Sequence, residues 1–310
     1  MIEQGHLVNL SYFLKNPKVL ESKAGQLQRS IAWETMINRG VGGFTKYGVY
    51  FSMMWLTGIR YPTEARLFRS GNFYWRWFDD VVDKDRPLPF QYQSREEFLQ
   101  SKRDIIESLS LHPATTIYGD RQDILLAHYV FLARKKNIDL TQESLDILRS
   151  IEIDLERGRE RRIFSQKELD GYFGLLDPAC IKGALKVARE DCDPEEFYPL
   201  SMAVRTFFNL RDFPKDFGDG LVNISMEDID KYGVDLTQLQ GKSTIEQLLT
   251  YEPIKNWYRG QTQSGLKYLD DSKERLDKLK LKSITRFVMW MHFTRPARKN
   301  LTKYAQMLAA

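Results

Sequence analysis

Residues that build disulfides, zinc sites and histidine-centred catalysis are scarce in this chain. Its 310 residues include two cysteines, Cys180 and Cys192, and four histidines. The cysteines make no disulfide framework and lack a zinc-binding spacing, so the sequence fits a reducing compartment. None of the four histidines is paired with a nucleophile in the sequence, and we assign them no chemistry.

Strong net charge and long apolar runs are also missing. The formal net charge of +4 is too small and too dispersed to indicate a nucleic-acid partner. The most apolar segment, residues 44–59, is shorter than the ~20 residues that cross a bilayer, and Lys46 interrupts it, so we expect a buried helix. The first residues lack the basic region and apolar stretch of a secretory signal. We therefore expect a cytoplasmic protein with at most peripheral membrane contact.

The pattern of apolar residues predicts helices and no sheet. No alternating apolar pattern persists, and the chain has no Gly-rich dinucleotide fingerprint, internal repeat or linker. We expect helices over residues 26–38, 62–83, 94–109, 120–136, 141–158, 243–251, 253–279 and from 283 onward, with capping boxes starting at Ser94 and Ser165. A further helix begins near residue 193 and leads into residues 212–216. The sequence therefore predicts an all-α protein of one domain, residues 1–310.

Two acidic clusters far apart in the chain share one geometry. Residues 79–83 (DDVVD) and 212–216 (DFPKD) each carry two aspartates four positions apart, Asp79 with Asp83 and Asp212 with Asp216. On a helix this spacing puts both carboxylates on one face. Two facing pairs would repel each other without a cation between them. Mg²⁺, which prefers oxygen ligands and is usually completed by substrate phosphates, is the natural candidate.

Basic residues accompany both clusters. Arg76 lies one helical turn before Asp79, and Arg211 and Lys215 flank the second pair. Carboxylates for a metal next to cations for phosphate are typical of an enzyme that handles a diphosphate. A single aspartate pair is more often a solvated helix face. However, five of the six residues 73–78 are aromatic and lead directly into the first cluster, which a solvated face would not carry.

Both clusters resemble motifs of a known family. Residues 76–83 (RWFDDVVD) resemble the first aspartate-rich motif of the squalene/phytoene synthases, and residues 209–220 (NLRDFPKDFGDG) resemble the second. Residues 154–156 (DLE) and 168–172 (ELDGY) are similar to the middle of the family pattern. Order and spacing agree over roughly residues 30–300. The resemblance implies a helical bundle of the isoprenoid synthase type with a central active-site cavity.

The departures from the family pattern are as informative as the matches. Residues 40–44 (GVGGF) replace a serine-rich segment that helps to hold a diphosphate. The asparagine of the second motif stands one step late, at Asn209, with Phe208 in the family position, and Arg205 replaces a common glutamine. Residues 175–181 (LLDPACI) replace a kink of small residues against which a second isoprenoid lies. The residues that would ionise the donor therefore resemble the family pattern, whereas those that would bind a second prenyl diphosphate differ from it.

The resemblance implies a Mg²⁺-dependent prenyltransferase that ionises an allylic prenyl diphosphate. The metal ligands that it implies are Asp79, Asp83, Asp212 and Asp216, and Arg211 and Tyr172 complete the catalytic set. The residues expected to bind substrate are Arg76, Lys215, Phe44, Lys46, Phe78, Phe208 and Asn209. The basic side chains would donate to diphosphate oxygens, and the rings would stabilise the allylic cation and exclude water.

The sequence leaves open what accepts the cation. Because the features suited to a second prenyl diphosphate are altered, transfer to an aromatic or other hydrophobic small molecule is the leading hypothesis. Head-to-head condensation of two prenyl diphosphates, cyclisation of one, and a non-catalytic binding protein of the same fold are the alternatives. The prenyl chain length, the use of a nicotinamide reductant and the oligomeric state do not follow from the sequence.

Pro214 lies between the aspartates of the second cluster. In a helix interior, proline removes the hydrogen bond to the carbonyl four residues earlier, here that of Leu210, and costs ~3 kcal/mol. We therefore expect that the helix bends or ends at Pro214, or that Asp216 is not a strict partner of Asp212.

Overall fold

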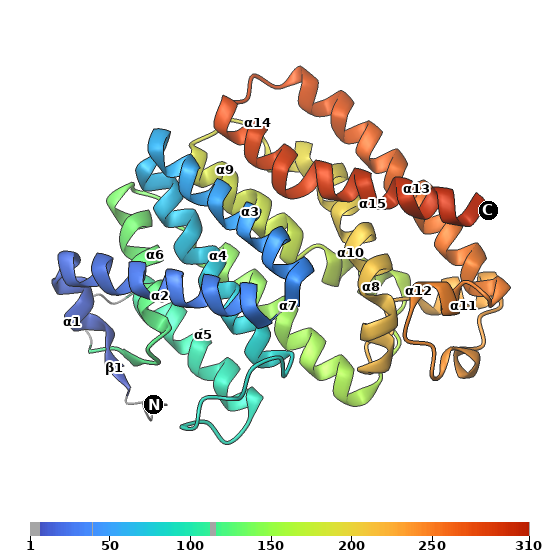
Figure 1. The fold of residues 1–310 in the computed structure, drawn as a ribbon, viewed down its shortest axis with the longest axis horizontal. Helices are drawn as coiled ribbons and strands as arrows, with labels where there is room; N and C mark the ends of the chain where they lie inside the picture. Colours follow the sequence, from blue (N-terminus) through green and yellow to red (C-terminus); the bar gives the residue numbers. More distant parts are fainter. Residues whose placement is uncertain (1–6, 39, 112–115, 310) are drawn as a thin grey trace. The chain divides into compact units, whose positions relative to one another are not determined.

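The computed structural model describes the backbone of residues 7–38, 40–111 and 116–309, and their side chains except at 38, 40–46 and 111. The described chain is almost wholly helical (Figure 1), with one short pairing of β1 (Val8–Asn9) and β2 (Tyr118–Gly119). The all-α prediction is confirmed. The chain divides into two compact units, residues 1–148 and 149–310, and the boundary falls inside helix α7 (Thr141–Glu160). A single domain spanning residues 1–310 stays a prediction.

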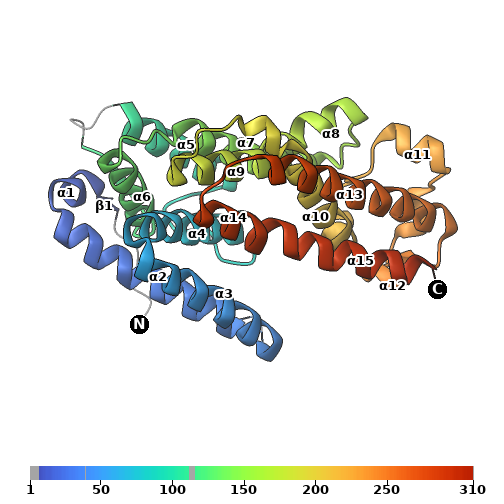
Figure 2. The ribbon, with the colours of Figure 1, turned by 90° about the horizontal axis from the view of Figure 1, so that it is seen from above.

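Helix α4 is the centre of the first unit. The helices of this unit before α7 are α1 (Leu10–Lys15), α2 (Pro17–Asn38), α3 (Gly40–Arg60), α4 (Pro62–Val82), α5 (Arg95–Leu111) and α6 (Asp123–Lys135). Helices α2 and α3 pack together against one side of α4, and α6 also contacts α4 (Figure 2). Phe73, Tyr74 and Phe78 of α4 are fully buried. The aromatic stretch before the first aspartate cluster is therefore part of the core of this unit.

Helix α3 departs from the expected burial. Phe51 is buried, but Val49, Leu56 and Ile59 are 58%, 62% and 81% exposed. The prediction of a buried helix over residues 44–59 is therefore wrong for one side of the helix. The reason is that α3 packs on α2 and α4 with part of its surface, and apolar composition does not reveal how many neighbours a helix has. In the described part of the chain, no helix is long and apolar enough to cross a membrane.

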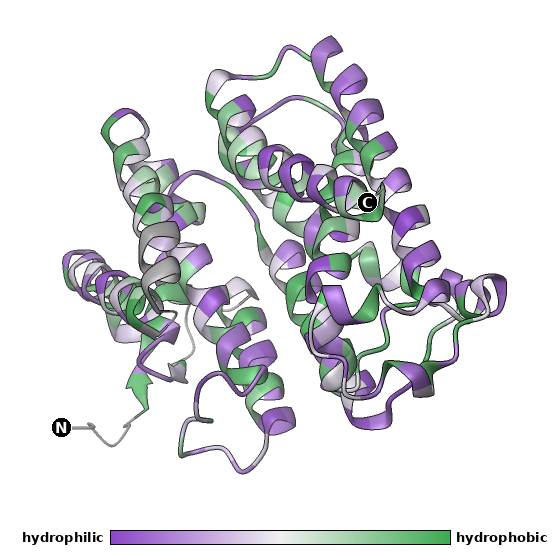
Figure 3. Ribbon diagram, turned by 45° about the vertical axis from the view of Figure 1, so that its right-hand side comes forward, coloured by the Kyte–Doolittle hydropathy of each residue, from purple (hydrophilic) through white to green (hydrophobic). Residues whose placement is uncertain are grey.

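Helix α10 (Tyr198–Gly218) is the centre of the second unit. It packs against α9 (Leu176–Ala188), α13 (Glu252–Lys278) and α15 (Arg295–Ala309) (Figure 1). Figure 3 colours most of α13 hydrophilic, yet its residues Ile254, Trp257 and Leu269 are buried. The shorter elements are α8 (Gln166–Phe173), α11 (Met226–Tyr232), α12 (Ile245–Leu248), α14 (Ser283–Met289), 3₁₀ turns at Pro194–Phe197 and Leu236–Leu239, and a π-helical turn at Trp290–Thr294.

The two predicted capping boxes are present to different degrees. Ser165 and Glu168 form the complete reciprocal pair at the start of α8. Ser94 accepts from the N–H of Glu97 at 3.1 Å, but the Glu97 carboxylate accepts from the N–H of Gln93, one residue before the expected one. Both signals nevertheless mark the start of a helix correctly.

Helix α10 continues through Pro214 and ends at Gly218. Proline lacks the N–H that would reach the carbonyl of Leu210. The hydroxyl of Tyr258, on α13, donates to that carbonyl instead, at 3.0 Å in a buried contact. A helix end at Pro214 is therefore wrong, because a side chain from another helix replaces the missing donor. Asp212 and Asp216 consequently lie on one helix.

Replacing Tyr258 with phenylalanine should lower the free energy of unfolding by on the order of 1–3 kcal/mol, because the buried Leu210 carbonyl loses its donor. Urea unfolding measures this loss. In a Pro214→Ala background the new N–H can reach Leu210, so the Tyr258→Phe cost should largely disappear. Tyr304→Phe is the matched control, because it removes the hydroxyl from a ring that contacts the ring of Tyr258. An equal Tyr258→Phe cost in both backgrounds would refute this explanation.

A buried polar chain crosses the core of the first unit. Gln28 Nε2 donates to Ser70 Oγ at 2.9 Å, and Ser70 Oγ lies 2.7 Å from His128 Nδ1. Burial, together with the charges of Arg66 and Arg69, lowers the pKa of His128 to about 4. The imidazole is therefore neutral in the folded protein at pH 7.

The pKa of His128 should make the protein acid-sensitive. The unfolded chain binds this proton near the ordinary histidine pKa of 6.5, and the folded protein binds it only at about 4. The contribution of neutral His128 to stability is therefore complete above about pH 6.5 and falls as the pH drops toward 4. The urea concentration at the unfolding midpoint should fall less steeply with decreasing pH in His128→Gln than in the wild type, because glutamine does not titrate. Parallel slopes would assign the effect to other groups, such as His292, whose pKa burial also lowers to about 4.

Candidate functional site

The first aspartate cluster lies at the C-terminal end of α4. Asp79 is in the last turn, and Asp83 ends the helix, with its N–H donating to the Asp79 carbonyl at 2.9 Å. The Asp79 side chain is 46% exposed, and Asp83 is exposed. Two accessible carboxylates at the negative end of a helix dipole are unfavourable unless cations lie nearby. The position of this pair therefore favours cation binding.

Asp80, between these two residues, is buried and holds two arginines. Arg76 Nη2 lies 2.7 Å from Asp80 Oδ1, whereas its Nη1 lies 4.0 Å from Asp79. Arg86 Nε lies 3.3 Å from Asp80 Oδ2, and Arg86 Nη1 lies 2.6 Å from Glu34. Arg76, predicted to bind substrate, is thus anchored by a residue that we did not predict for the site. The i, i+4 spacing of Arg76 and Asp80 was the available signal.

Arg95 stabilises the same helix end through the backbone. Its Nε donates to the carbonyls of Val81 and Val82, at 3.1 Å each. Carbonyls in the last turn of a helix have no partner within the helix. Arg95 thus places a third arginine at the end of α4 and fixes the backbone that carries the aspartates.

The ring of Phe78 lies in the core of the first unit. It is fully buried and stacks on Phe98, with ring centroids 5.3 Å apart. Packing explains this position without a substrate, so a role beside the cation stays a prediction for Phe78. The side chains of Phe44 and Lys46, like those of the other residues from 40 to 46, lie outside the described part of the structure.

The second aspartate cluster occupies the last two turns of α10. Arg211 makes two contacts with Asp212, Nε to Oδ1 at 2.7 Å and Nη2 to Oδ2 at 2.6 Å. The Arg211 guanidinium also lies over the ring of Phe208, 4.6 Å from its centroid. Lys215 is exposed on the same helix. Arg211 therefore contacts two other predicted site residues, Phe208 and Asp212.

Asp216 belongs to a hydrogen-bond network that continues into the interior of the second unit. Asn223 Nδ2 donates to Asp216 Oδ2 at 3.0 Å, and Asn223 Oδ1 accepts from Arg157 Nη1 at 3.0 Å. Asn209 Nδ2 donates to the backbone carbonyl of Asn223, also at 3.0 Å. The sequence marked Asn209 and Asp216 but not Asn223 or Arg157. Arg157 lies 66 residues before Asn223, and no short motif links residues that far apart in the chain.

Tyr172, on α8, adjoins the same arginine. Its hydroxyl donates to Asp154 Oδ2 at 2.8 Å, and the Arg157 guanidinium lies 5.2 Å from its ring centroid. Burial and the Asp154 carboxylate raise the pKa of Tyr172 well above its ordinary value. Tyr172 is therefore a neutral hydrogen-bond donor at physiological pH and cannot supply a phenolate base.

Arg205 and Asp177, which both stand where the sequence departs from the family pattern, form an ion pair. Arg205 Nε lies 2.7 Å from Asp177 Oδ2, and both side chains are largely buried, at 11% and 7% exposure. Burial alone would lower the pKa of Arg205, but the Asp177 carboxylate outweighs it and raises that pKa. The guanidinium also lies over the ring of Tyr172, 5.8 Å from its centroid. A charged pair thus adjoins the predicted catalytic tyrosine.

Glycine is required where the chain leaves α10. Gly220 has φ +94°, and a Cβ there would lie 2.6 Å from the backbone carbonyl of Gly158 on α7. The N–H of Leu221 then donates to the carbonyl of Asp216 at 2.7 Å. This tight turn brings residues 221–225 back along the end of α10 and presents Asn223 to Asp216.

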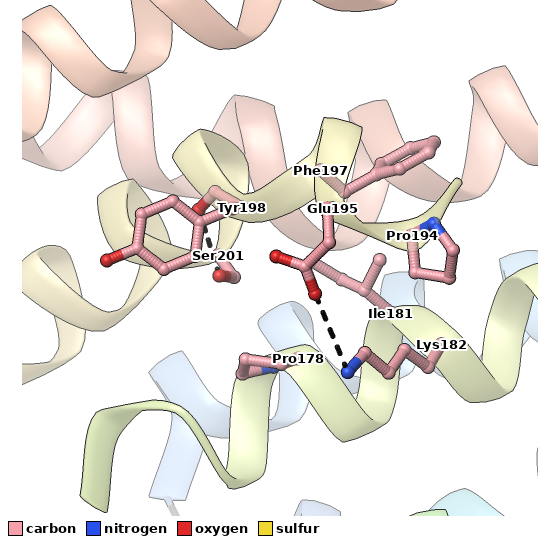
Figure 4. A pocket seen from close by; sticks show the side chains of 8 residues that line it. All are labelled: Pro178, Ile181, Lys182, Pro194, Glu195, Phe197, Tyr198 and Ser201. Carbon is pink, nitrogen blue, oxygen red and sulfur yellow. Dashed lines mark hydrogen bonds and ion pairs between the residues drawn. The ribbon is translucent and has the colours of Figure 1, made fainter. Parts of the chain in front are cut away.

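Two cavities in the structure contain none of the predicted site residues. The larger, about 280 Å³, lies in the first unit and is lined by residues of α5, α6 and the start of α7. The smaller, about 20 Å³, lies in the second unit between Pro178 and Tyr198, with Lys182 Nζ 3.9 Å from Glu195 (Figure 4). It has room for about one water molecule. The central active-site cavity stays a prediction.

The carboxylates of the two clusters form pairs rather than a larger ligand set. Among the described residues, no three side chains of histidine, cysteine, aspartate or glutamate come together as a preformed metal site. The first pair belongs to the first unit, and the second pair belongs to the second unit. Each unit therefore offers two predicted ligands, accompanied by its own arginines.

Comparison with known proteins finds a solved structure with a similar fold. No family model and no curated protein matches the sequence. Among solved structures, the chain is similar to squalene synthase HpnC from Alicyclobacillus acidocaldarius, with a TM-score of 0.55 over 78% of this chain and 81% of the other. The chain has a squalene-synthase-like fold. Because the two sequences are 12% identical, the likeness concerns the fold alone, and it confirms the predicted resemblance at that level.

Within this squalene-synthase-like fold, Asp80 should matter for stability more than its neighbours do. Asp80→Ala leaves Arg76 and Arg86 without their shared carboxylate, and should lower the free energy of unfolding by on the order of 2–4 kcal/mol. Asp79→Ala removes an accessible charge at the negative end of α4, so its effect should be neutral or slightly stabilising. Urea unfolding of both variants measures the difference. Similar losses in both would contradict the assignment of Asp80 as the structural carboxylate.

Proposed function

We propose that this chain is a Mg²⁺-dependent prenyltransferase that ionises an allylic prenyl diphosphate and transfers the prenyl group to a small aromatic acceptor. One observation carries the proposal. A chain with a squalene-synthase-like fold holds two aspartate pairs near the C-terminal ends of α4 and α10, each with an arginine beside it.

The aspartate pairs suit Mg²⁺. This ion takes one or two carboxylates and completes its shell with waters and phosphate oxygens, so a pair of oxygen ligands in each unit is a fitting set. Asp79 and Asp83 would hold metal in the first unit, and Asp212 and Asp216 in the second. When bound, the metal would neutralise the negative charge that develops on the leaving diphosphate.

The arginines would bind the diphosphate itself. Arg211 is paired with Asp212 in the described structure, so Asp212 must exchange this partner in order to ligate a metal. The released guanidinium would donate to a diphosphate oxygen, and the ring of Phe208 would keep it in place. Lys215, exposed on the same helix, would donate to the same group, and Arg76, anchored on Asp80, would donate to a diphosphate oxygen at the first aspartate pair. Binding of metal and binding of substrate would thereby be coupled.

The reaction breaks the donor's C–O bond, and its electron pair leaves with the diphosphate. The π electrons of the aromatic acceptor form the new C–C bond with the allylic cation, and the acceptor then loses a proton to water or to the diphosphate. We propose that Tyr172 and Phe208 lie along the cation, which aromatic faces stabilise. Tyr172 would act through its ring, because its hydroxyl remains protonated and bound to Asp154.

The ion pair of Arg205 and Asp177 supports an acceptor other than a second prenyl diphosphate. Both residues belong to parts of the chain that depart from the family pattern, and the Arg205 guanidinium lies over the ring of Tyr172. A hydrocarbon chain lying on this pair would remove its remaining water without offering hydrogen bonds, which is costly. An aromatic molecule with polar substituents could offer them. This physical difference favours aromatic transfer.

Head-to-head condensation of two prenyl diphosphates is the second candidate function. It is favoured by the similar solved structure, which is that of a squalene synthase. It would have to accommodate a second hydrocarbon chain despite the Arg205–Asp177 pair.

The test is diphosphate release from dimethylallyl, geranyl, farnesyl and geranylgeranyl diphosphates, each supplied singly, with Mg²⁺ or with EDTA and with mass spectrometry of the products. We expect little release from a donor alone and Mg²⁺-dependent release when aromatic acceptors are added. The Asp79→Ala, Asp83→Ala double variant should lose this activity by at least a thousandfold, on the order expected when electrostatic stabilisation of the leaving group is removed.

The other outcomes discriminate between the alternatives. A hydrocarbon with twice the carbons of the donor would establish head-to-head condensation, and a cyclic product of unchanged carbon number would establish a cyclase. Activity in the double aspartate variant would contradict the assignment of Asp79 and Asp83 as metal ligands. No release under any condition would indicate a binding protein with this fold.

A further inference from the structure

Asn223 lies between two opposite charges in the second unit. It is buried in the segment that follows α10, with Arg157 on one side of its amide and Asp216 on the other. The short motifs that mark the aspartate pairs do not include it. Its contacts nevertheless make it the direct partner of a predicted metal ligand.

The amide is chemically matched to this position. Arginine can only donate hydrogen bonds, and an ionised carboxylate can only accept them. A neutral group that joins the two must therefore accept on one side and donate on the other. Asn223 does this, with Oδ1 toward Arg157 and Nδ2 toward Asp216, both at 3.0 Å. The two charged neighbours thereby fix the orientation of the amide.

The partners of Asn223 are themselves held in place. Arg157 is almost fully buried, donates from Nη2 to the carbonyl of Val222 at 2.8 Å, and lies over the ring of Phe164 at 4.3 Å. Asn209 holds the backbone carbonyl of Asn223. The side chain and the backbone of Asn223 are thus both fixed, and Asp216 is bonded to a rigid neighbour.

An amide spacer also has a different effect from a direct ion pair. A guanidinium in contact with a carboxylate competes with a metal ion for its oxygens. Asn223 instead presents a neutral N–H to Asp216, and Arg157 holds the other side of the amide. This arrangement is typical of groups that orient a metal ligand from behind.

We propose that Asn223 is a positioning residue for the second metal site, and that it holds Asp216 in the rotamer that ligates Mg²⁺ in the presence of diphosphate. The inference rests on the proposed function. It adds a specific dependence of metal affinity on a residue outside both aspartate motifs.

The test uses the full chain and two readouts. Asn223→Ala should raise the Mg²⁺ concentration for half-maximal diphosphate release about tenfold, as expected when a partner of a metal ligand is lost. Binding of Mn²⁺ in the presence of inorganic pyrophosphate, followed by electron paramagnetic resonance of the free ion, should weaken by a similar factor. Asn300→Ala is the matched control, since Asn300 makes one side-chain hydrogen bond to the carbonyl of Pro296 on α15.

A double-variant comparison asks whether Asn223 acts through Asp216. Asp216→Asn should itself weaken Mn²⁺ binding, and adding Asn223→Ala to it should cause no further loss. If Asn223→Ala does not fold, Asn223→Gln takes its place, because the longer side chain keeps the amide but displaces its N–H from Asp216. Weakened Mn²⁺ binding by this variant would support the proposal equally.

The outcomes separate this inference from the function on which it rests. A wild-type protein that neither binds Mn²⁺ with pyrophosphate nor releases diphosphate would overturn the proposed function. A wild-type protein that does both, with unchanged metal affinity in the Asn223 variants, would overturn the role of Asn223 alone. Lower activity at every Mg²⁺ concentration without a shift in metal affinity would likewise make Asn223 merely structural.

Discussion

Negative charge gathers near the C-terminal ends of two helices, where the helix dipole is also negative, and cations must compensate it. The compensating cations are arranged differently at the two helix ends. At the end of α4, the buried Asp80 binds Arg76 and Arg86 directly, which leaves Asp79 and Asp83 on the accessible side. Near the end of α10, one aspartate is paired with its neighbouring arginine, and the other is reached by a buried arginine through an amide. Arginines thus anchor the part of each helix that carries an aspartate pair.

Local signals in the sequence were sufficient for most of the helices. Capping residues, the proline at the start of α4 and helical periodicity act within a few residues, so they predict where a helix begins without knowledge of its neighbours. The exposed side of α3 could not be predicted in this way, because burial depends on what packs against a helix. The continuation of α10 through Pro214 could not be predicted from local signals either, because the compensating hydroxyl of Tyr258 lies on another helix.

The candidate site shows the same division. Aspartates four apart on a helix are visible in the sequence, and the structure places Asp212 and Asp216 on one helix as that spacing requires. The partners that hold them are visible only in part: Arg76 to Asp80 is a helical spacing, whereas Arg157 to Asn223 spans two distant segments. A short motif identifies groups that act on a ligand. The groups that orient them come from elsewhere in the chain.

The hydrogen bond from Tyr258 to Leu210 implies an order of assembly. Pro214 removes a main-chain bond of α10, and the replacement donor lies 48 residues further along the chain, on α13. During synthesis α10 emerges first, and its last turns remain incomplete until α13 has been made and has packed against it. The stretch of helix that carries the second aspartate pair therefore gains this hydrogen bond only once a later helix of its unit is in place.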